Sequence, residues 1–588
     1  MLAGSAHGDG VQKLDQINVF GHYETAVGTS DAASSGYITP QLIDDRPLQR
    51  PGEVLEYVPG MIVTQHSGAG KANQYFLRGF NLDHGTDFAT YLAGMPVNLR
   101  THAHGQGYMD LNFMIPELVS RVDYYKGPYF AQQGDFATAG SANIHYVESL
   151  PNTLAELGIG TEKYGRALLA GSPEFGPGQV VYGIELYHDN GPWEHPDNYR
   201  KLNGVLRYTQ KTGDSQWGVT AMGYSGKWNS TDQIPQRAVD EGLIDRLGTI
   251  DPSDGGRTYR YSLSGDYQKQ LAGGQLKSTA YAIRYYLKLY SNFTYYLDDP
   301  VNGDQFNQYD NRKILGWNGS WTRPDKLFGL EMTHTMGWDI RQDRLNPVAI
   351  YNTIQRQRVS TKREDRVRET SYAIYAENQT HWTDWLRTIT GIRGDRYDFK
   401  VDSNIAENSG SRSAGIGSPK LSVILGPWQK TEYFVNFGEG FHSNDGRGTT
   451  THVDPNTGEA VDPVTPLVRA KGAEVGVRTE VIPNLQSSLS FWYLHLDSEL
   501  VFQGDTGTDT AGRPSKRTGI EWSNHCTPNK WLLFDLDLAV FNIFDSKADD
   551  ITYYYRSRLP GEPASGVNDI HFHPVESRSF RLAALVSF

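Results

Sequence analysis

The sequence predicts a mainly β protein, a transmembrane antiparallel β-barrel of about 18 strands that follows a small α+β unit. Three observations support this fold class: segments in which apolar and polar residues alternate, connections that are alternately short and long, and a change of pattern near residue 150. The composition agrees, because 62 glycines, 35 tyrosines and a mean hydropathy of −0.54 describe a large polar chain punctuated for β structure.

The alternation is clearest in two segments of the C-terminal part. In residues 281–289 every odd position is apolar or aromatic, whereas the even positions include Arg284 and Lys288. Residues 580–588 repeat this pattern, and weaker versions lie at 180–188 and 486–497. A period of two places one apolar face and one polar face on each strand.

The connections between these segments follow a rule of their own. Tight turns are expected at 176–178, 212–214, 272–274 and 483–485, and long polar loops at 229–257, 292–313, 345–366 and 443–467. Short turns at one end and long loops at the other are typical of outer-membrane barrels. A soluble propeller or sandwich is the alternative, but a propeller needs internal repeats of about 40–50 residues, and the sequence has none.

The part before residue 150 has a mixed pattern. A short helix is expected to begin at Pro51 and to end at Pro59 and Gly60, because proline favours a first helical turn. Short β runs follow at 61–64 and 75–78, and a helical turn at 115–119 leads into a strand at 121–125. These elements predict a small α+β unit.

Several classes of protein are excluded. The net charge of −13 argues against a nucleic-acid binder, which is usually basic. The single Cys526 excludes a disulfide framework and cysteine-based zinc modules. No run approaches about 18 uninterrupted apolar residues, so no transmembrane helix is expected. No nucleophile elbow, P-loop or HExxH motif is present, so no enzyme is expected.

Short strings spread along nearly the whole chain have an order and a spacing that are more specific than any one of them. They lie at 50–60 (RPGEVLEYVPG), 77–80 (LRGF), 121–128 (RVDYYKGP), 139–144 (AGSANI), 541–545 (FNIFD) and at the terminal Phe588. In this order they resemble the TonB-dependent outer-membrane receptor family. The resemblance implies a periplasmic segment at 1–40, a plug domain at 41–150 and, at 151–588, a β-barrel that encloses the plug in the outer membrane of a Gram-negative cell.

A β-prone segment near the start resembles the TonB box of that family. It consists of Leu14, Asp15, Gln16, Ile17, Asn18, Val19 and Phe20. Such a box pairs as an added strand with the energy-transducing partner, which requires β propensity rather than fixed chemistry. A stray β-prone tail is the alternative. The position of the segment ahead of the plug favours the box.

The resemblance also implies a function. It is energised uptake of a scarce nutrient, by default an iron–siderophore, with another small molecule or metal (zinc, copper, haem, an aromatic compound or a glycan) as alternatives. The expected partners are a TonB-type protein, the ligand, and outer-membrane lipid and lipopolysaccharide, and the expected state is a monomer without cofactor. A receptor that only transmits a signal is less favoured, because the box at Leu14 leaves no room for the extra domain of signalling relatives.

Two departures from the family pattern stand out. The string at 93–97 (AGMPV) lacks the acidic residue that often precedes the glycine of the central plug hairpin. The family barrel has about 22 strands, whereas about 18 are expected here. Residues 531–540 run directly into the string of the next-to-last strand, so four strands are expected to be missing. A transport-defective barrel is therefore a further alternative.

One cluster of the plug predicts ligand contact. It consists of Asp83, His84, Arg100, His102, His104 and Tyr108. His102 and His104 would face the same way in an extended segment, and imidazoles bind zinc, copper or iron, whereas Arg100 could pair with an anionic ligand. Two further pairs in expected loops, Trp193 with His195 and His571 with His573, are also candidates for ligand contact. The alternative is a polar loop that hydrogen-bonds the barrel wall.

Overall fold

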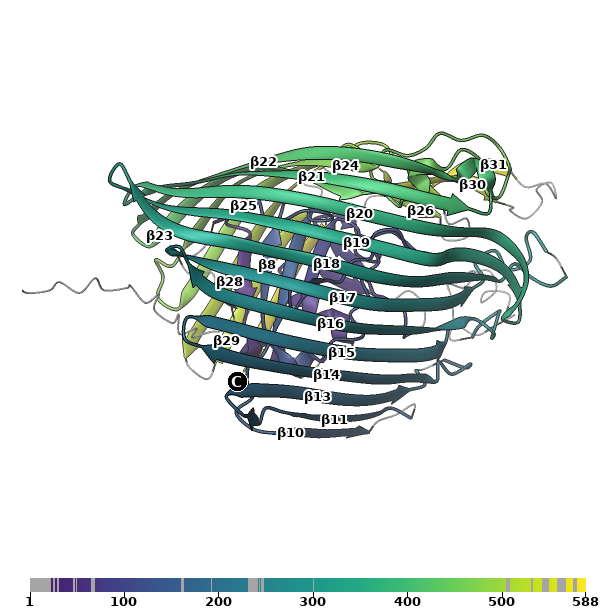
Figure 1. Ribbon diagram of the computed structural model, residues 1–588, viewed down its shortest axis with the longest axis horizontal. Helices are drawn as coiled ribbons and strands as arrows, with labels where there is room; N and C mark the ends of the chain where they lie inside the picture. The colour runs from purple at the N-terminus through teal and green to yellow at the C-terminus, as the bar shows by residue number, and fades with distance from the viewer. Residues whose placement is uncertain are drawn as a thin grey trace, which may run out of the picture.

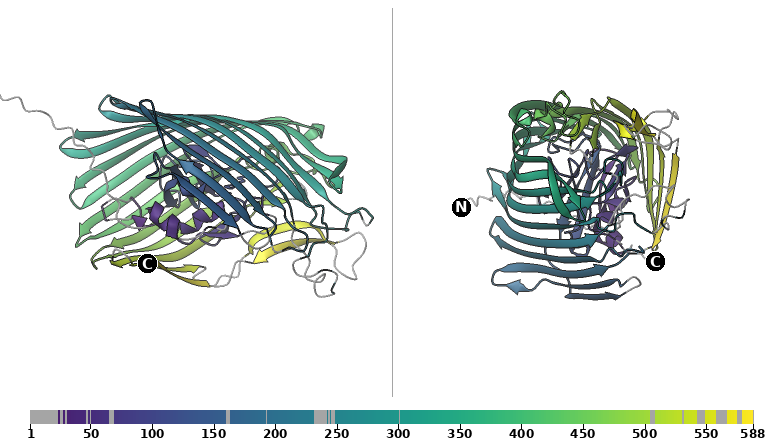
Figure 2. Two further views of the ribbon diagram at one scale, coloured as in Figure 1. Left: turned by 90° about the horizontal axis from the view of Figure 1, so that it is seen from below. Right: turned by 90° about the vertical axis from the view of Figure 1, so that its right-hand side faces the viewer.

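The computed structural model describes residues 23–24, 27–28, 31–45, 48, 50–64, 69–159, 163–191, 193–230, 242, 244, 248–299, 301–503, 508–529, 532–541, 549–557, 567–574 and 579–587. A long antiparallel sheet curves around an N-terminal domain, which we call the plug (Figure 1). Figure 2 (right) shows the same arrangement from one end, with the purple plug strands surrounded by the larger sheet. Within the described residues no helix is long and apolar enough to cross a membrane.

The plug is a six-stranded sheet in the order β1-β2-β8-β9-β6-β7, with a three-stranded sheet β3-β4-β5 beside it. Its strands are β1 (Tyr23–Glu24), β2 (Ser35–Ile38), β3 (Ile62–Thr64), β4 (Gln74–Leu77), β5 (Phe80–Asn81), β6 (Phe88–Leu92), β7 (Met95–Pro96), β8 (Val119–Lys126) and β9 (Gly140–Tyr146). Its helices are α1 (Pro40–Asp45), η1 (Pro51–Tyr57) and η2 (Pro116–Leu118). Because β2 pairs with β8, the sheet of the plug begins before residue 41, where the sequence analysis put the boundary.

The predicted plug elements are confirmed. The 3-10 helix η1 begins at a proline, buries Val54, Leu55 and Tyr57, and ends before Val58, close to the predicted end of the helix. The expected helical turn is η2, and the expected strands are β3, β4 and β8.

The larger sheet has nineteen strands, of which the two-residue β12 pairs with the same neighbour as β11 does. Its first strands are β10 (Leu154–Ile159), β11 (Gly165–Gly171), β12 (Glu174–Phe175), β13 (Gly178–Asp189), β14 (Tyr199–Thr212), β15 (Ser215–Asn229), β16 (Gly255–Leu271), β17 (Gly274–Ser291), β18 (Phe306–Leu327) and β19 (Leu330–Ile354). The rest are β20 (Gln357–Thr383), β21 (Leu386–Ser403), β22 (Gly410–Trp428), β23 (Thr431–Ser443), β24 (Leu467–Thr479), β25 (Leu485–Leu496), β28 (Ser515–Asn529), β29 (Leu532–Phe541) and β32 (Ser579–Ser587). The predicted fold class and the count of about 18 full strands agree with this sheet.

Short elements lie in the long connections. They are η3 (Ala406–Asn408), η4 (Gly448–Thr450), the pair β26 (Leu500–Gln503) and β27 (Thr508–Ala511), and the hairpin β30 (Asp549–Ser557) with β31 (Val567–Pro574). The hairpin stands between β29 and β32 in the chain, so the last long loop contains strands that do not join the large sheet. β29 pairs with β28 and β32, as expected for a next-to-last strand. Among the described residues β10 and β32 are the two edges of the sheet and do not pair with each other.

Two expected loops are wrong in whole or in part. Residues 306–313 of the expected loop 292–313 already belong to β18. Residues 345–366, which the sequence analysis interpreted as a long loop, continue β19 and β20 to a turn at Gln355 and Arg356, both with positive φ. β19 has 25 residues and β20 has 27, whereas about 9–11 residues cross a membrane. The outer parts of these strands stand in water, where no apolar outward face is needed, and so the sequence shows no clear alternation there.

The clearest alternation has its apolar side turned inward. Tyr281, Ile283, Tyr285, Leu287 and Leu289 on β17 are at most 6% exposed and pack in the same core as the plug. A barrel strand has lipid on one side and the plug on the other, and both are apolar. A period of two therefore does not show whether the apolar face of the strand contacts the lipid or the plug. Other strands supply the outward apolar side chains, among them Leu206, Leu263, Leu315, Ile374, Ile392, Val435 and Phe491.

Candidate functional site

The candidate site lies at one tip of the plug, in residues 100–108, which we call the apex segment. Two backbone hydrogen bonds close this segment into a loop, from Leu99 N to Tyr108 O (3.0 Å) and from Gly107 N to Arg100 O (3.1 Å). Gly107 has φ +72°, and a Cβ there would lie 3.0 Å from the backbone of Thr86, so only glycine fits. The apex segment is therefore a fixed loop and not an extended strand.

Three histidines and one tyrosine of the predicted cluster come together. His104 Nε2 lies 3.0 Å from His84 Nε2, and the ring of His102 stacks on Tyr108 at 4.1 Å between centroids. All four side chains are buried, with exposures of 0–5%. The structure thus groups His84, His102, His104 and Tyr108 as the sequence predicted, in a space closed to solvent.

Hydrogen bonds orient two of the imidazoles. His84 Nδ1 lies 3.0 Å from the carbonyl oxygen of Asn73, and His104 Nδ1 lies 2.7 Å from Oε1 of Gln308 on β18. Because a backbone carbonyl only accepts, Nδ1 of His84 donates to Asn73, and its Nε2 accepts the 3.0 Å hydrogen bond from Nε2 of His104. Burial lowers the pKa of His84, so its neutral form is favoured. Metal-binding histidines commonly donate one ring N–H to an oxygen of the protein and bind the metal through the other ring nitrogen.

His102 has a different role from the one that its spacing predicted. Its Nδ1 accepts the backbone N–H of His104 at 3.1 Å, and its Nε2 lies 3.3 Å from the Tyr285 hydroxyl of β17. Burial, followed by the charges of Arg312 and Arg447, lowers the pKa of His102 well below its usual range. In a closed loop, residues two apart in the sequence do not share a face. His104 therefore contacts the imidazole of His84 through Nε2, and not that of His102.

Arg100 is held by the protein itself. Its Nε lies 3.0 Å from Oδ2 of Asp135, one terminal nitrogen donates to the Tyr397 hydroxyl at 2.9 Å, and the guanidinium stacks on the Tyr397 ring. Asp135 also accepts from the backbone N–H and the hydroxyl of Ser443 at the end of β23. The guanidinium therefore joins plug to wall, as the hydrogen-bonded-loop alternative described.

The long connection between β23 and β24 covers the apex segment. Asp445 Oδ2 accepts the backbone N–H of His102 at 3.2 Å, and Arg447 donates to the His102 carbonyl at 2.8 Å. Asp445 N also donates to Oε1 of Gln106 at 2.8 Å. Both charged side chains are 1% exposed, so this connection closes the outer side of the apex.

Sequence reasoning missed a set of buried ion pairs around the apex. The pairs are Asp310 with Arg312, Arg341 with Asp343, Arg363 with Asp365, Arg393 with Asp395, and Asp445 with Arg447. Each joins residues two apart in the sequence, and on a strand such residues lie on one face. An Arg-x-Asp or Asp-x-Arg pattern on a strand thus indicated a charge pair on one face, but not which face, because Arg396 and Asp398 form the same pattern on the exposed side of β21.

The remaining candidates lie elsewhere. Asp83 is near the cluster, with Oδ1 3.7 Å from His84 Nε2. Trp193 and His195 are half-buried in the connection between β13 and β14. His571 and His573 lie on β31 of the separate hairpin, and their side chains are outside the described residues. The TonB-box segment 14–20, residues 542–545 and Phe588 are also outside them.

Metal-binding geometry in the described residues is limited to pairs. No group of three or more His, Cys, Asp or Glu side chains there is arranged to hold a metal ion. The His84–His104 pair is thus the strongest arrangement of donors among the apex side chains.

Comparison with known proteins decides the family. Residues 28–141 match the TonB-dependent receptor plug domain, and residues 187–575 match the β-barrel of TonB-dependent receptors. The chain belongs to the TonB-dependent receptor family. Members of this family are outer-membrane receptors for nutrient uptake, so the receptor has its place in the outer membrane, and its partners are a TonB-type protein and a ligand.

Solved structures share the fold of the receptor at low sequence identity. The unliganded ferric citrate transporter FecA has a TM-score of 0.70 and 13% identity, over 87% of this chain and 78% of that one. The ferric yersiniabactin receptor FyuA from Yersinia pestis has 0.67 and 14%, over 88% and 79%. The copper transporter OprC has 0.66 and 15%, over 87% and 79%. At these identities the likeness shows the fold alone.

Proposed function

We propose that the receptor imports a ferric siderophore across the outer membrane, driven by a TonB-type protein that pulls the segment 14–20. The observation that carries this proposal is a plug that packs against the inner face of the large sheet, with its polar apex hydrogen-bonded beneath the long connection between β23 and β24. Solved structures of the same fold are named for ferric citrate and ferric yersiniabactin, which supports an iron chelate as the nutrient.

The position of the pulled segment in the chain indicates what moves first. The box precedes β1 and β2, which form one edge of the six-stranded sheet of the plug. A pull on the box would load the two-residue pairing of β1 with β2 first and then the four-residue pairing of β2 with β8. Release of β2 would also withdraw Ile38, which is fully buried in the main hydrophobic core, so the energy of the motor would open the plug from this side.

A substitution in the box tests the coupling. Ile17→Pro removes a backbone N–H that strand addition needs, whereas the matched control Ile17→Val keeps it. In cells fed radioactive ferric citrate or ferric yersiniabactin, the proline variant should lose uptake and retain binding, and the control should keep both. Equal uptake by both variants would indicate a passive barrel. Induction of the receptor by carbon limitation and not by iron limitation would contradict an iron chelate.

A second candidate, direct capture of a transition-metal ion, rests on the His84–His104 pair. Two Nε2 atoms 3.0 Å apart, each with Nδ1 bound to an oxygen, match the donor set of copper or zinc. His84→Ala and His104→Ala should each weaken Cu²⁺ or Zn²⁺ binding by roughly tenfold or more. His102→Ala is the matched control, because its ring bonds the apex backbone and Tyr285. Equal loss in all three variants, or no metal binding by the intact receptor, would exclude this candidate.

A further inference from the structure

Four residues of the connection between β23 and β24 lie on the apex segment as a bound ligand would. They are residues 444–447 (Asn-Asp-Gly-Arg), which we call the cover segment. All four are buried, and they form five hydrogen bonds with residues 101–106 of the plug. The cover segment thus takes up polar groups of the apex that a ligand arriving from outside would meet.

The cover segment binds the backbone of the apex. The N–H of His102 donates to Oδ2 of Asp445 at 3.2 Å, and the carbonyl of His102 accepts from Arg447 at 2.8 Å. Beside them, the N–H of Gly446 donates to the hydroxyl of Thr101 at 2.7 Å. Asp445 and Arg447 also pair with each other at 2.7 Å, so the cover segment brings its own charge balance to the apex.

The amide of Gln106 completes the set. Its oxygen accepts the N–H of Asp445 at 2.8 Å, and its nitrogen donates to Asn444 at 3.4 Å. The apex therefore presents three acceptors, on Thr101, His102 and Gln106, and two donors, on His102 and Gln106. A partner needs N–H groups for these acceptors and carbonyl or carboxylate oxygens for these donors. Both kinds of group lie side by side in a peptide.

The cover segment is held by hydrogen bonds and not by apolar packing. Residues 443–451 (SNDGRGTTT) include no apolar side chain. In the part of the chain that the structure describes, none of the buried hydrophobic clusters includes a residue of 443–466. A hydrogen bond exchanges for an equivalent one at little net cost, whereas apolar surface pulled out of a core is exposed to water. A partner with the same polar groups can therefore replace the cover segment.

The flanks of the cover segment are fixed to other parts of the protein. Before it, the N–H and the hydroxyl of Ser443 both donate to Asp135 of the plug at 2.7 Å. After it, Asn408 of η3 accepts the N–H groups of His452 and Val453 at 2.8 and 2.9 Å. The cover segment can therefore leave the apex as a short strap while both flanks stay in place.

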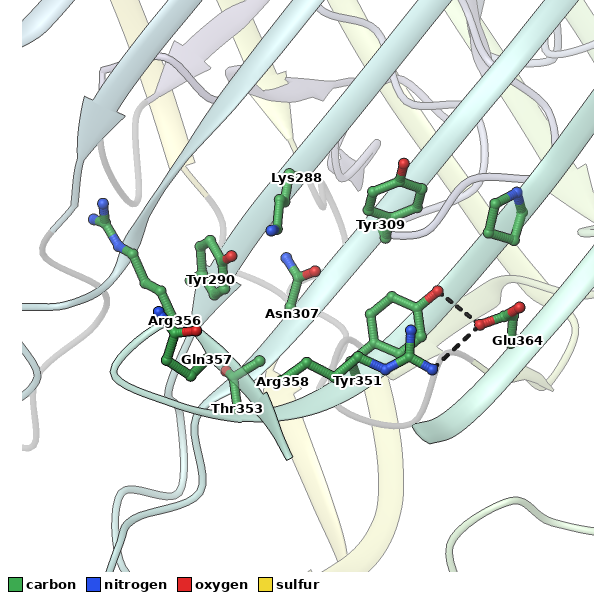
Figure 3. A pocket seen from close by; sticks show the side chains of 11 residues that line it. Lys288, Tyr290, Asn307, Tyr309, Tyr351, Thr353, Arg356, Gln357, Arg358 and Glu364 are labelled. Carbon is green, nitrogen blue, oxygen red and sulfur yellow. Dashed lines mark hydrogen bonds and ion pairs between the residues drawn. The ribbon is translucent and has the colours of Figure 1, made fainter. Parts of the chain in front are cut away.

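A cleft near the outer ends of β17–β20 lies on the other side of the wall. It has a volume of about 490 Å³, and Asn307 and Tyr309 of β18 line it (Figure 3). Gln308, which stands between them, is fully buried and lies 2.7 Å from the ring of His104 in the plug. Because neighbours on a strand point to opposite faces, the cleft opens away from the apex. It gives no access to the apex, whose outer side the cover segment closes.

We propose that the cover segment is a built-in substitute for the ligand, and that a peptide-based iron chelate displaces it and takes over its hydrogen bonds. The amide N–H groups of the chelate replace those of Asp445 and Gly446, and its carbonyl or carboxylate oxygens replace the side chain of Asp445. This ligand class rests on the proposed import of a ferric siderophore and narrows it. A chelate with carboxylates alone leaves the acceptors of the apex without donors.

Two variants release the cover segment in different ways. Asp445→Ala/Arg447→Ala removes both of its charged side chains. Gly446→Val keeps the charges and adds a side chain where a Cβ would lie only 3.2 Å from its neighbours. The matched control is Arg358→Ala/Glu364→Ala, an exposed ion pair of 3.5 Å in the outward cleft (Figure 3). A heat-modifiability gel confirms that each barrel has folded, and the second release variant serves if the first does not fold.

Binding to the purified receptor in detergent is measured by calorimetry. The probe is ferrichrome, a cyclic peptide that holds iron through hydroxamates, and the comparator is ferric citrate, which has no N–H group. Both release variants should bind ferrichrome at least about tenfold more tightly than the wild type and the control. The reason is that a cover segment in place for about nine-tenths of the time or more raises the apparent Kd by that factor. An equal gain for ferric citrate, or no ferrichrome binding by any of the four proteins, would overturn the peptide class.

Hydrogen exchange of the wild type tests the displacement itself. With ferrichrome bound, the amides of Asp445 and Gly446 should exchange faster, whereas the amide of His102 should stay protected. Protection of all three amides, or equal ferrichrome affinity in all four proteins, would overturn the displacement. These measurements need no energy-transducing partner. Displacement without uptake into cells would therefore count against the proposed import alone, and uptake of iron without displacement would count against the substitute alone.

Discussion

Replacement of Arg78 should loosen the plug from the barrel wall. Its guanidinium contacts both carboxylate oxygens of Glu521 at 3.0 and 3.1 Å and reaches Glu474 at 3.4 Å, while Lys126 contacts Glu521 at 2.8 Å. The four side chains are at most 8% exposed. Two buried cations of the plug thus balance two buried carboxylates of the barrel wall, which lie on β24 and β28.

Arg78→Met fills a similar volume but loses the cation–π contact with Trp492 and leaves Lys126 alone against two carboxylates. Removal of one partner from a buried ion pair costs about 3–5 kcal/mol, and we expect this loss in the free energy of plug docking. The double variant Arg78→Met/Glu521→Gln restores one cation to one carboxylate. It should recover about 2 kcal/mol, because the two positions share one network.

Urea-dependent proteolysis of the purified receptor in detergent measures the plug separately from the barrel. The plug of Arg78→Met should become cleavable at lower urea, while the heat-modifiability of the barrel stays unchanged. A single variant as resistant as the wild type, or a double variant weaker than the single one, would refute the charge-balance reasoning.

Two further predictions concern the plug. Burial raises the pKa of Asp110 from 3.8 to about 6, so the folded plug favours the protonated acid. The free energy of unfolding of the plug should therefore decrease by about 3 kcal/mol as the pH rises from about 4 to above 6. Asp110→Asn should flatten this pH dependence in urea titrations, and an unchanged slope would contradict the prediction. Arg100→Ala should lower the melting temperature of the receptor without any ligand, because Asp135 loses its buried partner; a loss of ligand binding at unchanged stability would instead restore Arg100 as a ligand contact.

The sequence alone determined the class of the fold and five elements of the plug, η1, η2, β3, β4 and β8. Period-two alternation, short turns such as that at Gly213, and a proline-started helix at Pro51 are local signals, and the structure confirms each of them. Local signals suffice there because a turn or a first helical turn is decided by the residues that form it. The grouping of the apex histidines was also predicted, since all of them lie within one short stretch of chain.

Only the tertiary structure decided which faces and partners these residues meet. Alternation in β17 does not tell whether its apolar side faces lipid or plug, since both are apolar neighbours. The loop closed by Gly107 turns the rings of His102 and His104 towards different partners and places His84 against the ring of His104. Arg100 meets Asp135 and Tyr397 across 35 and 297 residues of sequence. Such contacts between distant residues depend on strand pairing that no local pattern specifies.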